Sequence, residues 1–122
     1  MSTIQLTENT FESAVSAPGI LLIDFWAAWC GPCRMFTPVF ENASTAHPDV
    51  RFAKVDTEAQ PMLSTNLGIS SIPTLMIFRD GILLYEQPGA LPAAALEQLI
   101  TKAQDLDMDE VRQQLTARTP TA

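Results

Sequence analysis

The chain has few of the residues that build disulfide scaffolds and metal centres. Its 122 residues include two cysteines and one histidine, His47. Disulfide-stabilised domains need several cysteine pairs, and a structural zinc ion takes four ligands, which two cysteines and one histidine do not supply. We therefore expect no metal site, and we interpret His47 as a solvated residue of a polar turn.

Basic charge is scarce, and no long uninterrupted apolar segment is present. Seven Lys and Arg residues against fourteen Asp and Glu residues give a net charge of −7, which disfavours nucleic acid and anionic membranes as partners. Residues Met1–Gln5 lack the basic start and apolar core of a secretory signal, and Asp24 interrupts the longest apolar run. We expect a soluble cytoplasmic protein, whose 47% hydrophobic composition suffices for one core.

A short apolar run precedes the two cysteines. Ile20–Phe25 is apolar and contains β-branched residues, which predicts a strand buried on both faces. The C-x-x-C spacing of Cys30 and Cys33 brings two sulfurs within disulfide reach when the second cysteine lies in the first turn of a helix. Apolar residues then recur at helical spacing, at Met35, Phe36, Val39 and Phe40. The sequence therefore predicts a helix that begins at the cysteines.

This position predicts a redox role for the two thiols. The unpaired N–H groups at a helix N-terminus favour a thiolate, so we expect the pKa of Cys30 to lie below the ordinary thiol value of about 8.5. Cys30, one step outside the helix, is the predicted nucleophile, and Cys33, more enclosed, would then attack the mixed disulfide. Pro32 suits the first helical turn, and Gly31 leaves the backbone open to a substrate.

The stretch Phe25–Cys33, with the sequence FWAAWCGPC, resembles the active-site signature of thioredoxin. The resemblance runs from about residue 3 to residue 104, and its other matches are Asp24, Lys54, Ile72-Pro73-Thr74, Gly81 and Gly89. It implies the thioredoxin fold, an α/β fold with a central mixed five-stranded sheet flanked by helices on both faces. Ser71 and the segments 50–54 and 57–59 resemble the thioredoxin 2 type, without the N-terminal zinc module that members of that type often carry.

The resemblance implies a protein-disulfide reductase that maintains the redox state of the cytoplasm. It also implies that no cofactor is bound and that electrons come from NADPH through a flavin-dependent thioredoxin reductase. The partners would then be this reductase and disulfide-containing proteins, with the chain itself a monomer. Gly31-Pro32 between the cysteines matches reducing thioredoxins rather than oxidases or isomerases. The alternatives are a disulfide isomerase or oxidase, or a binding or chaperone-like module whose thiols are incidental.

Asp24 and Lys54 are candidate catalytic residues beside the cysteines. A lone carboxylate in a buried strand is costly unless it is protonated, hydrogen-bonded or paired, so we expect a raised pKa for Asp24. In thioredoxins the matching aspartate moves protons to and from the second cysteine through water, and Lys54 resembles its lysine partner. The alternative is a structural pair that lowers stability.

A shallow apolar surface around the cysteines is the predicted substrate site. The Ile72–Pro73 bond precedes a strand and is a candidate cis bond. The resemblance implies that it is cis, that Pro73 lies beside the disulfide, and that the Ile72 backbone pairs with an extended substrate peptide. The other members of this predicted surface are Trp29, Gly31, Pro32, Gly89 and Ala90. Since alternate residues point oppositely, we expect Trp26 in the core and Trp29 at the surface.

The remaining patterns place the other elements. We expect strands at 3–6, 20–25, 50–55, 75–78 and 83–86, and helices from Thr7 to about 15, from the cysteines with a break or kink near Pro38, at 61–67 and at 92–103. Residues 1–104 would form one domain and 105–122 an extension. In that extension Asp107 and Glu110 resemble a capping box before residues at helical spacing. It is either an extra helix, packed on the domain or on a second chain as in a weak dimer, or a frayed acidic tail.

Overall fold

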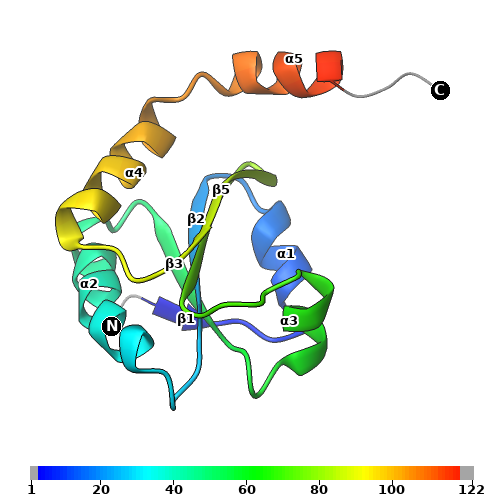
Figure 1. Ribbon diagram of the computed structural model, residues 1–122. Helices are drawn as coiled ribbons and strands as arrows, with labels where there is room; N and C mark the ends of the chain where they lie inside the picture. The colour runs from blue at the N-terminus through cyan, green and yellow to red at the C-terminus, as the bar shows by residue number, and fades with distance from the viewer. Residues whose placement is uncertain (1–2, 119–122) are drawn as a thin grey trace.

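A computed structural model describes residues 3–118, with side chains as far as residue 116 (Figure 1). Along the chain the elements are β1 (Thr3–Gln5), α1 (Phe11–Ser16), β2 (Ile20–Trp26), α2 (Gly31–Ala46), β3 (Arg51–Asp56), α3 (Pro61–Asn66), β4 (Thr74–Arg79), β5 (Ile82–Pro88), α4 (Ala93–Asp105) and α5 (Met108–Arg118). Every strand and helix expected from the sequence is present, with ends shifted by a few residues. Within the described part of the chain, no helix is both long and apolar enough to cross a membrane.

The strands form one mixed sheet with the order β1-β3-β2-β4-β5. β1, β3 and β2 run parallel, whereas β4 is antiparallel to β2 and β5 is antiparallel to β4. Figure 1 shows α2 and α4 on one side of the sheet and α1 and α3 on the other. Because β2 is central and covered on both faces, its apolar run is buried throughout. The predicted fold class is confirmed.

Alternation along β2 decides which face each side chain meets. Ile20 and Leu22 belong to the core with α2 and α4, whereas Leu21 and Ile23 belong to the core with α1 and α3. Since successive side chains of a strand point to opposite faces, Asp24 lies on the face covered by α2. The helix that carries the cysteines therefore packs over the predicted acid.

Phenylalanines fix the position of α2 on the sheet. Phe36 and Phe40 of the helix are fully buried, and the ring of Phe40 meets that of Phe52 on β3 edge-on with centroids 5.2 Å apart. Each such side chain contributes about 1.5–3 kcal/mol by burial. The helix runs unbroken through Pro38, so the expected break is wrong. Pro38 is exposed, so its ring and the lost backbone bond lie away from the packed side.

His47 differs from its predicted state. Its Nε2 lies 2.8 Å from Glu97 Oε1, so the end of α2 is tied to α4. The expectation of a merely solvated histidine is wrong, because α4 passes close enough to supply a carboxylate. Within residues 3–118, no three His, Cys, Asp or Glu side chains gather as metal ligands.

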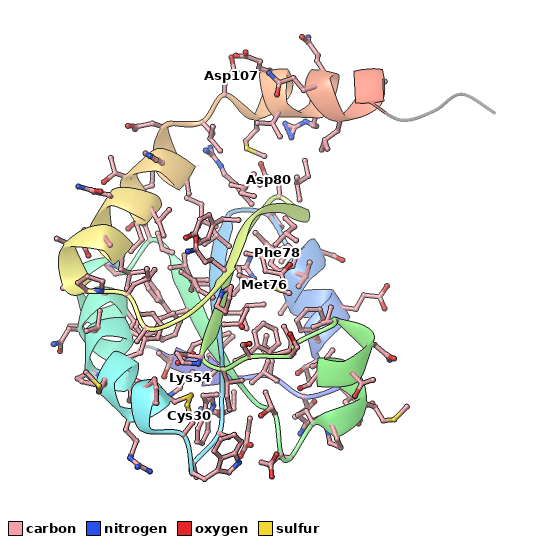
Figure 2. All side chains as sticks on the ribbon, viewed as in Figure 1. Cys30, Lys54, Met76, Phe78, Asp80 and Asp107 are labelled. Carbon is pink, nitrogen blue, oxygen red and sulfur yellow. A yellow bond between two sulfur atoms is a disulfide. The ribbon has the colours of Figure 1, made fainter. Side chains whose placement is uncertain are left out.

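The extension continues as a helix beside the β4–β5 hairpin. Asp107 Oδ1 accepts hydrogen bonds from the N–H groups of Asp109 and Glu110, at 3.0 and 3.2 Å, and thereby caps α5. Met108 is buried, and Arg112 approaches Asp80 at 3.9 Å. Figure 2 shows Asp80 at the hairpin tip beneath α5. The extension is therefore helical over 108–118, with Met108 buried and most of its other described side chains exposed.

Candidate active site

The two cysteines sit at the N-terminus of α2 and form a disulfide. Cys30 is the N-cap residue, with extended backbone angles, and its Cα lies 5.2 Å from that of Cys33. The helix begins there because Pro32 occupies the first turn, where its missing N–H costs no bond. The helix start predicted from the change of period is confirmed.

One backbone N–H group points at the sulfur of Cys30. The N–H of Cys33 donates to Cys30 Sγ at 3.2 Å, the bond that a capping side chain normally accepts. In the reduced protein a donor in this position favours the charged thiolate over the neutral thiol. This donor supports the prediction that Cys30 is the nucleophile.

Both sulfurs lie just beneath the surface. Cys30 is 4% exposed and Cys33 is 1% exposed. The order of the two exposures agrees with the prediction, but the expectation of an outward-facing Cys30 is too strong. Ala27, Trp26 and Ile72 pack around the pair and cover most of it. A substrate disulfide must therefore come directly against the small exposed part of Cys30 to be attacked by its sulfur.

The predicted substrate surface surrounds that opening. Trp29 is 65% exposed, and Gly31 and Pro32 beside it are exposed too. The Ile72–Pro73 peptide is cis, and the carbonyl oxygen of Ile72 lies 3.7 Å from Cys30 Sγ.

The last strand supplies the opposite edge of the surface. The N–H of Gly89 donates to the Pro73 carbonyl at 2.7 Å, which brings the exposed residues Gly89 and Ala90 alongside. Pro73 itself is buried, so it offers a substrate little surface, contrary to expectation.

A second hollow lies on the far side of Trp29. It has a volume of about 260 Å³, and its walls include Trp29, Glu58, Ile69 and Ile72. Neither Glu58 nor Ile69 was a candidate binding residue from sequence, since the hollow forms only where their segments meet Trp29 and Ile72. The hollow adjoins the cysteine opening through the shared residues Trp29 and Ile72.

Asp24 is fully buried on the sheet face that α2 covers. Within the described residues, neither of its carboxyl oxygens has a hydrogen-bond partner, and the indole N–H of nearby Trp26 has none either. Burial raises the pKa of Asp24 to about 7, against the lowering effect of Lys54 and with a further rise from Glu41. The expectation of a raised pKa is confirmed, so this carboxyl gains and loses a proton near neutral pH.

The Lys54 side chain lies close to more than one neighbouring residue. It is paired in register with Asp24 across β2 and β3. Its Nζ lies 4.0 Å from Glu41 Oε1 and 4.9 Å above the ring centre of Trp26. Glu41 was missed from the sequence. The available signal was its spacing of eight residues from Cys33, about two helical turns, which places it on a neighbouring side of α2.

Comparison with known proteins places these features in one family. A family model described as Thioredoxin matches residues 2–102. The chain is 58% identical over 111 residues to a Streptomyces coelicolor protein named "Putative thioredoxin 2", a match that covers 91% of this chain and 83% of the relative. It is 42% identical over 97 residues to a thioredoxin of Alicyclobacillus acidocaldarius, covering 79% of this chain and 92% of the relative.

Solved structures of similar fold support the same family. A thioredoxin of Malassezia sympodialis superposes with a TM-score of 0.75 at 33% identity, covering 84% of this chain and 94% of that chain. A chain from a study of how yeast mitochondrial 1-Cys peroxiredoxin is resolved via glutathione and thioredoxin systems also gives a TM-score of 0.75, at 34% identity. That match covers 86% of this chain and 96% of the other. The match to the Streptomyces relative is longer than the segment 2–102, so it runs on into the C-terminal extension.

Proposed function

This chain belongs to the thioredoxin family and is a protein-disulfide reductase, and we propose that it serves as a reductant of the cytoplasm, supplied with electrons from NADPH by a flavin-dependent thioredoxin reductase. The observation that carries the proposal is the Cys30–Cys33 pair at the tip of α2, with the Cys33 N–H directed at the first sulfur. The Gly-Pro pair between the cysteines supports the reducing direction.

The first step is attack by the Cys30 thiolate on a substrate disulfide. A bond forms between Cys30 Sγ and one substrate sulfur, and the other substrate sulfur leaves as a thiolate that takes up a proton. The Cys33 N–H at 3.2 Å stabilises the attacking thiolate before the reaction. The Ile72 carbonyl, 3.7 Å from the same sulfur, is positioned to accept a hydrogen bond from the Cys30 thiol when it is protonated.

The second step closes the intramolecular disulfide. Cys33 attacks Cys30, the substrate leaves with two reduced sulfurs, and the Cys33 thiol proton is lost as the bond forms. We assign its acceptance to Asp24, through water, because a carboxyl with a pKa of about 7 changes protonation state at neutral pH. Lys54, its partner in register, sets the charge that this carboxyl faces.

Substrate binding uses the surface around the opening. We propose that an extended peptide lies along the Ile72 backbone as an added strand, with Trp29, Gly31, Pro32 and Ala90 in contact with its side chains. This surface is shallow, so contacts to backbone atoms supply more of the affinity than pockets do. Such binding suits many different disulfide-containing proteins.

The test is reduction of insulin disulfides by the full-length protein, with NADPH and a bacterial thioredoxin reductase as the electron source. We expect turnover by the wild type, none by Cys30→Ser, and a stable mixed disulfide with substrate in Cys33→Ser, because the second step then lacks its nucleophile. An inactive wild type would support a binding module with incidental thiols. Activity with dithiothreitol but not with NADPH and reductase would reject the proposed electron source.

The direction and place of the reaction need separate measurements. A reduction potential near the value of about −270 mV known for thioredoxin would support a reductant, whereas a value near −120 mV would indicate an oxidant. We also propose a cytoplasmic location and a monomer. Fractionation of the source cells and light scattering at micromolar concentration test these two statements.

A further inference from the structure

Four side chains from four elements meet on the sheet face under α2. Asp24 belongs to β2, Lys54 to β3, Glu41 to α2 and Thr3 to the edge strand β1. Figure 2 shows Lys54 at the same end of the sheet as Cys30. The mechanism above uses Asp24 and Lys54 but gives Glu41 and Thr3 no part.

The lysine approaches the carboxylate of the helix. Within residues 3–118, the carboxylate within 4.0 Å of Lys54 Nζ is that of Glu41, although the register partner of Lys54 is Asp24. The Asp24 oxygens have no hydrogen-bond partner among the described residues. A buried carboxylate that formed a direct ion pair with the ammonium would be held ionised well below neutral pH.

Glu41 is itself held in place. Thr3 Oγ1 donates to its two carboxyl oxygens at 3.1 and 3.3 Å, so the edge strand anchors the carboxylate on the lysine side. The Lys54 side chain is 8% exposed and that of Glu41 is 26% exposed, so water screens this pair less than a surface pair. The Trp26 ring, 4.9 Å from Nζ, limits where the ammonium can move.

We infer that Glu41 is a positioning residue for disulfide reduction: anchored by Thr3, it holds the Lys54 ammonium away from Asp24 and thereby keeps that carboxyl able to exchange the proton of Cys33. The inference rests on the proposed function, because it concerns the second step of the same reaction. In that step the Cys33 thiol gives its proton to the Asp24 carboxylate as its sulfur bonds to Cys30. The charged groups that act on the Asp24 carboxyl are Lys54 from β3, which lowers its pKa, and Glu41 from α2, which raises it.

The experiment compares Glu41→Gln with Glu12→Gln in the full-length oxidised protein. Glu12 is exposed on α1, on the opposite face of the sheet, so its substitution makes the same charge change away from the site. The Asp24 carboxyl is followed by carbon NMR from pH 4 to 9, with the Asp24→Asn protein identifying its signal. We expect the midpoint in Glu41→Gln to fall by about half a unit, because the negative charge of Glu41 no longer raises it and Lys54 is then free to face Asp24. Thr3→Val, described next, keeps that charge and so isolates the effect of positioning. Glu12→Gln should titrate like the wild type.

Thr3→Val is the second variant, since it keeps the charge and removes only the anchor. We expect a smaller downward shift of the same midpoint, and the pH profile of insulin reduction should move with it in both site variants. An unchanged midpoint in Glu41→Gln, in a protein that still unfolds cooperatively, would overturn the inference. That result leaves the proposed function standing if the wild type reduces insulin. A wild type that does not reduce insulin would reject the proposed function. An unshifted midpoint in Glu41→Gln would reject the electrostatic role of Glu41, whatever the insulin assay shows.

Discussion

The two ends of the central sheet differ in whether their polar side chains have hydrogen-bond partners. At the cysteine end, both oxygens of Asp24 and the indole N–H of Trp26 lack hydrogen-bond partners among the described residues. At the hairpin end, Arg79 Nη1 donates to the carbonyls of Ala103, Gln104 and Leu106, at 2.8 to 3.2 Å. Native proteins leave few such groups unsatisfied, and those that remain concentrate where function requires them. The cysteine end is therefore arranged for chemistry and the hairpin end for stability.

At the hairpin end of the sheet, the polar groups of the turn also have hydrogen-bond or ion-pair partners. Asp80 and Gly81 both have positive φ, 54° and 83°, as a two-residue turn between antiparallel strands requires. Asp80 Oδ1 accepts the N–H of Gly19 at 2.8 Å, and its other oxygen faces Arg112. One acidic side chain thus connects the turn, the start of β2 and α5. From this contrast we expect substitutions at the cysteine end to lower activity and substitutions at the hairpin end to lower stability alone.

The largest expected effect is at the cysteine end. Asp24→Asn should raise the free energy of unfolding at pH 8 by about 2–4 kcal/mol while slowing disulfide reduction. The folded-state pKa of Asp24, about 7, lies above its ordinary value of 3.8, so the folded protein binds the extra proton. Stability of the wild type therefore falls as pH rises from about 4 to about 7. Urea unfolding at pH 8 and pH 4 should show the gain only at pH 8.

Unchanged turnover in Asp24→Asn would remove the catalytic role of the carboxyl and leave a purely structural cost. Equal stability of the two proteins at pH 8 would contradict the contrast between the ends.

The next effect is at the hairpin end and has the opposite sign. Arg79→Met should lower the free energy of unfolding by about 2–3 kcal/mol, because hydrogen bonds from a charged donor to the carbonyls that end α4 are lost. Insulin reduction at a temperature where the variant is folded should match the wild type. Urea unfolding and the insulin assay check the two statements, and a loss of activity in the folded variant would show that the ends are coupled.

A smaller loss is expected from the extension. Met108→Ala should cost about 1–2 kcal/mol, because the side chain is buried on the domain but belongs to a terminal helix that can adjust. Truncation after Gln104 should lower the melting temperature as well and leave the mass in solution that of a monomer. Light scattering and calorimetry test this. An unchanged melting temperature in both proteins would make α5 irrelevant to stability, and a smaller assembly after truncation would indicate pairing of two chains through it.

The smallest effect concerns the outermost contact. Arg112→Ala should change the free energy of unfolding by less than about 0.5 kcal/mol, because its partners Asp80 and Asp109 are at least partly exposed and solvent screens such pairs. Added salt should make little further difference. A loss above 1 kcal/mol in urea unfolding would mean that this pair, and not Met108, fastens the helix.

Features that depend on neighbours along the chain were predictable. The change from the apolar run Ile20–Phe25 to helical spacing marked the start of α2, and the C-x-x-C spacing marked the disulfide. Burial of Asp24 followed from its place inside the run. Each of these follows from periodicity over a few residues, which the backbone geometry of strands and helices imposes.

Contacts between side chains of different helices and strands were not predictable from the sequence. The approach of Glu41 to Lys54 joins residues on α2 and β3, and the bridge from His47 to Glu97 joins α2 to α4. The hydrogen bond from Gly89 to the Pro73 carbonyl and the packing of Ile72 beside Cys30 also join separate segments of the chain. None of these contacts leaves a local pattern in the residues that make it.

By itself the sequence determined the chemical group and its local setting: two thiols at the start of a helix, after a buried strand, with an acid inside that strand. The tertiary structure decided the strand order, the partner of Lys54, the depth of the sulfurs and the packing of α5. The physical reason is that helix and strand periods act over neighbouring residues, whereas charge pairing and burial depend on which distant segments the sheet register brings together.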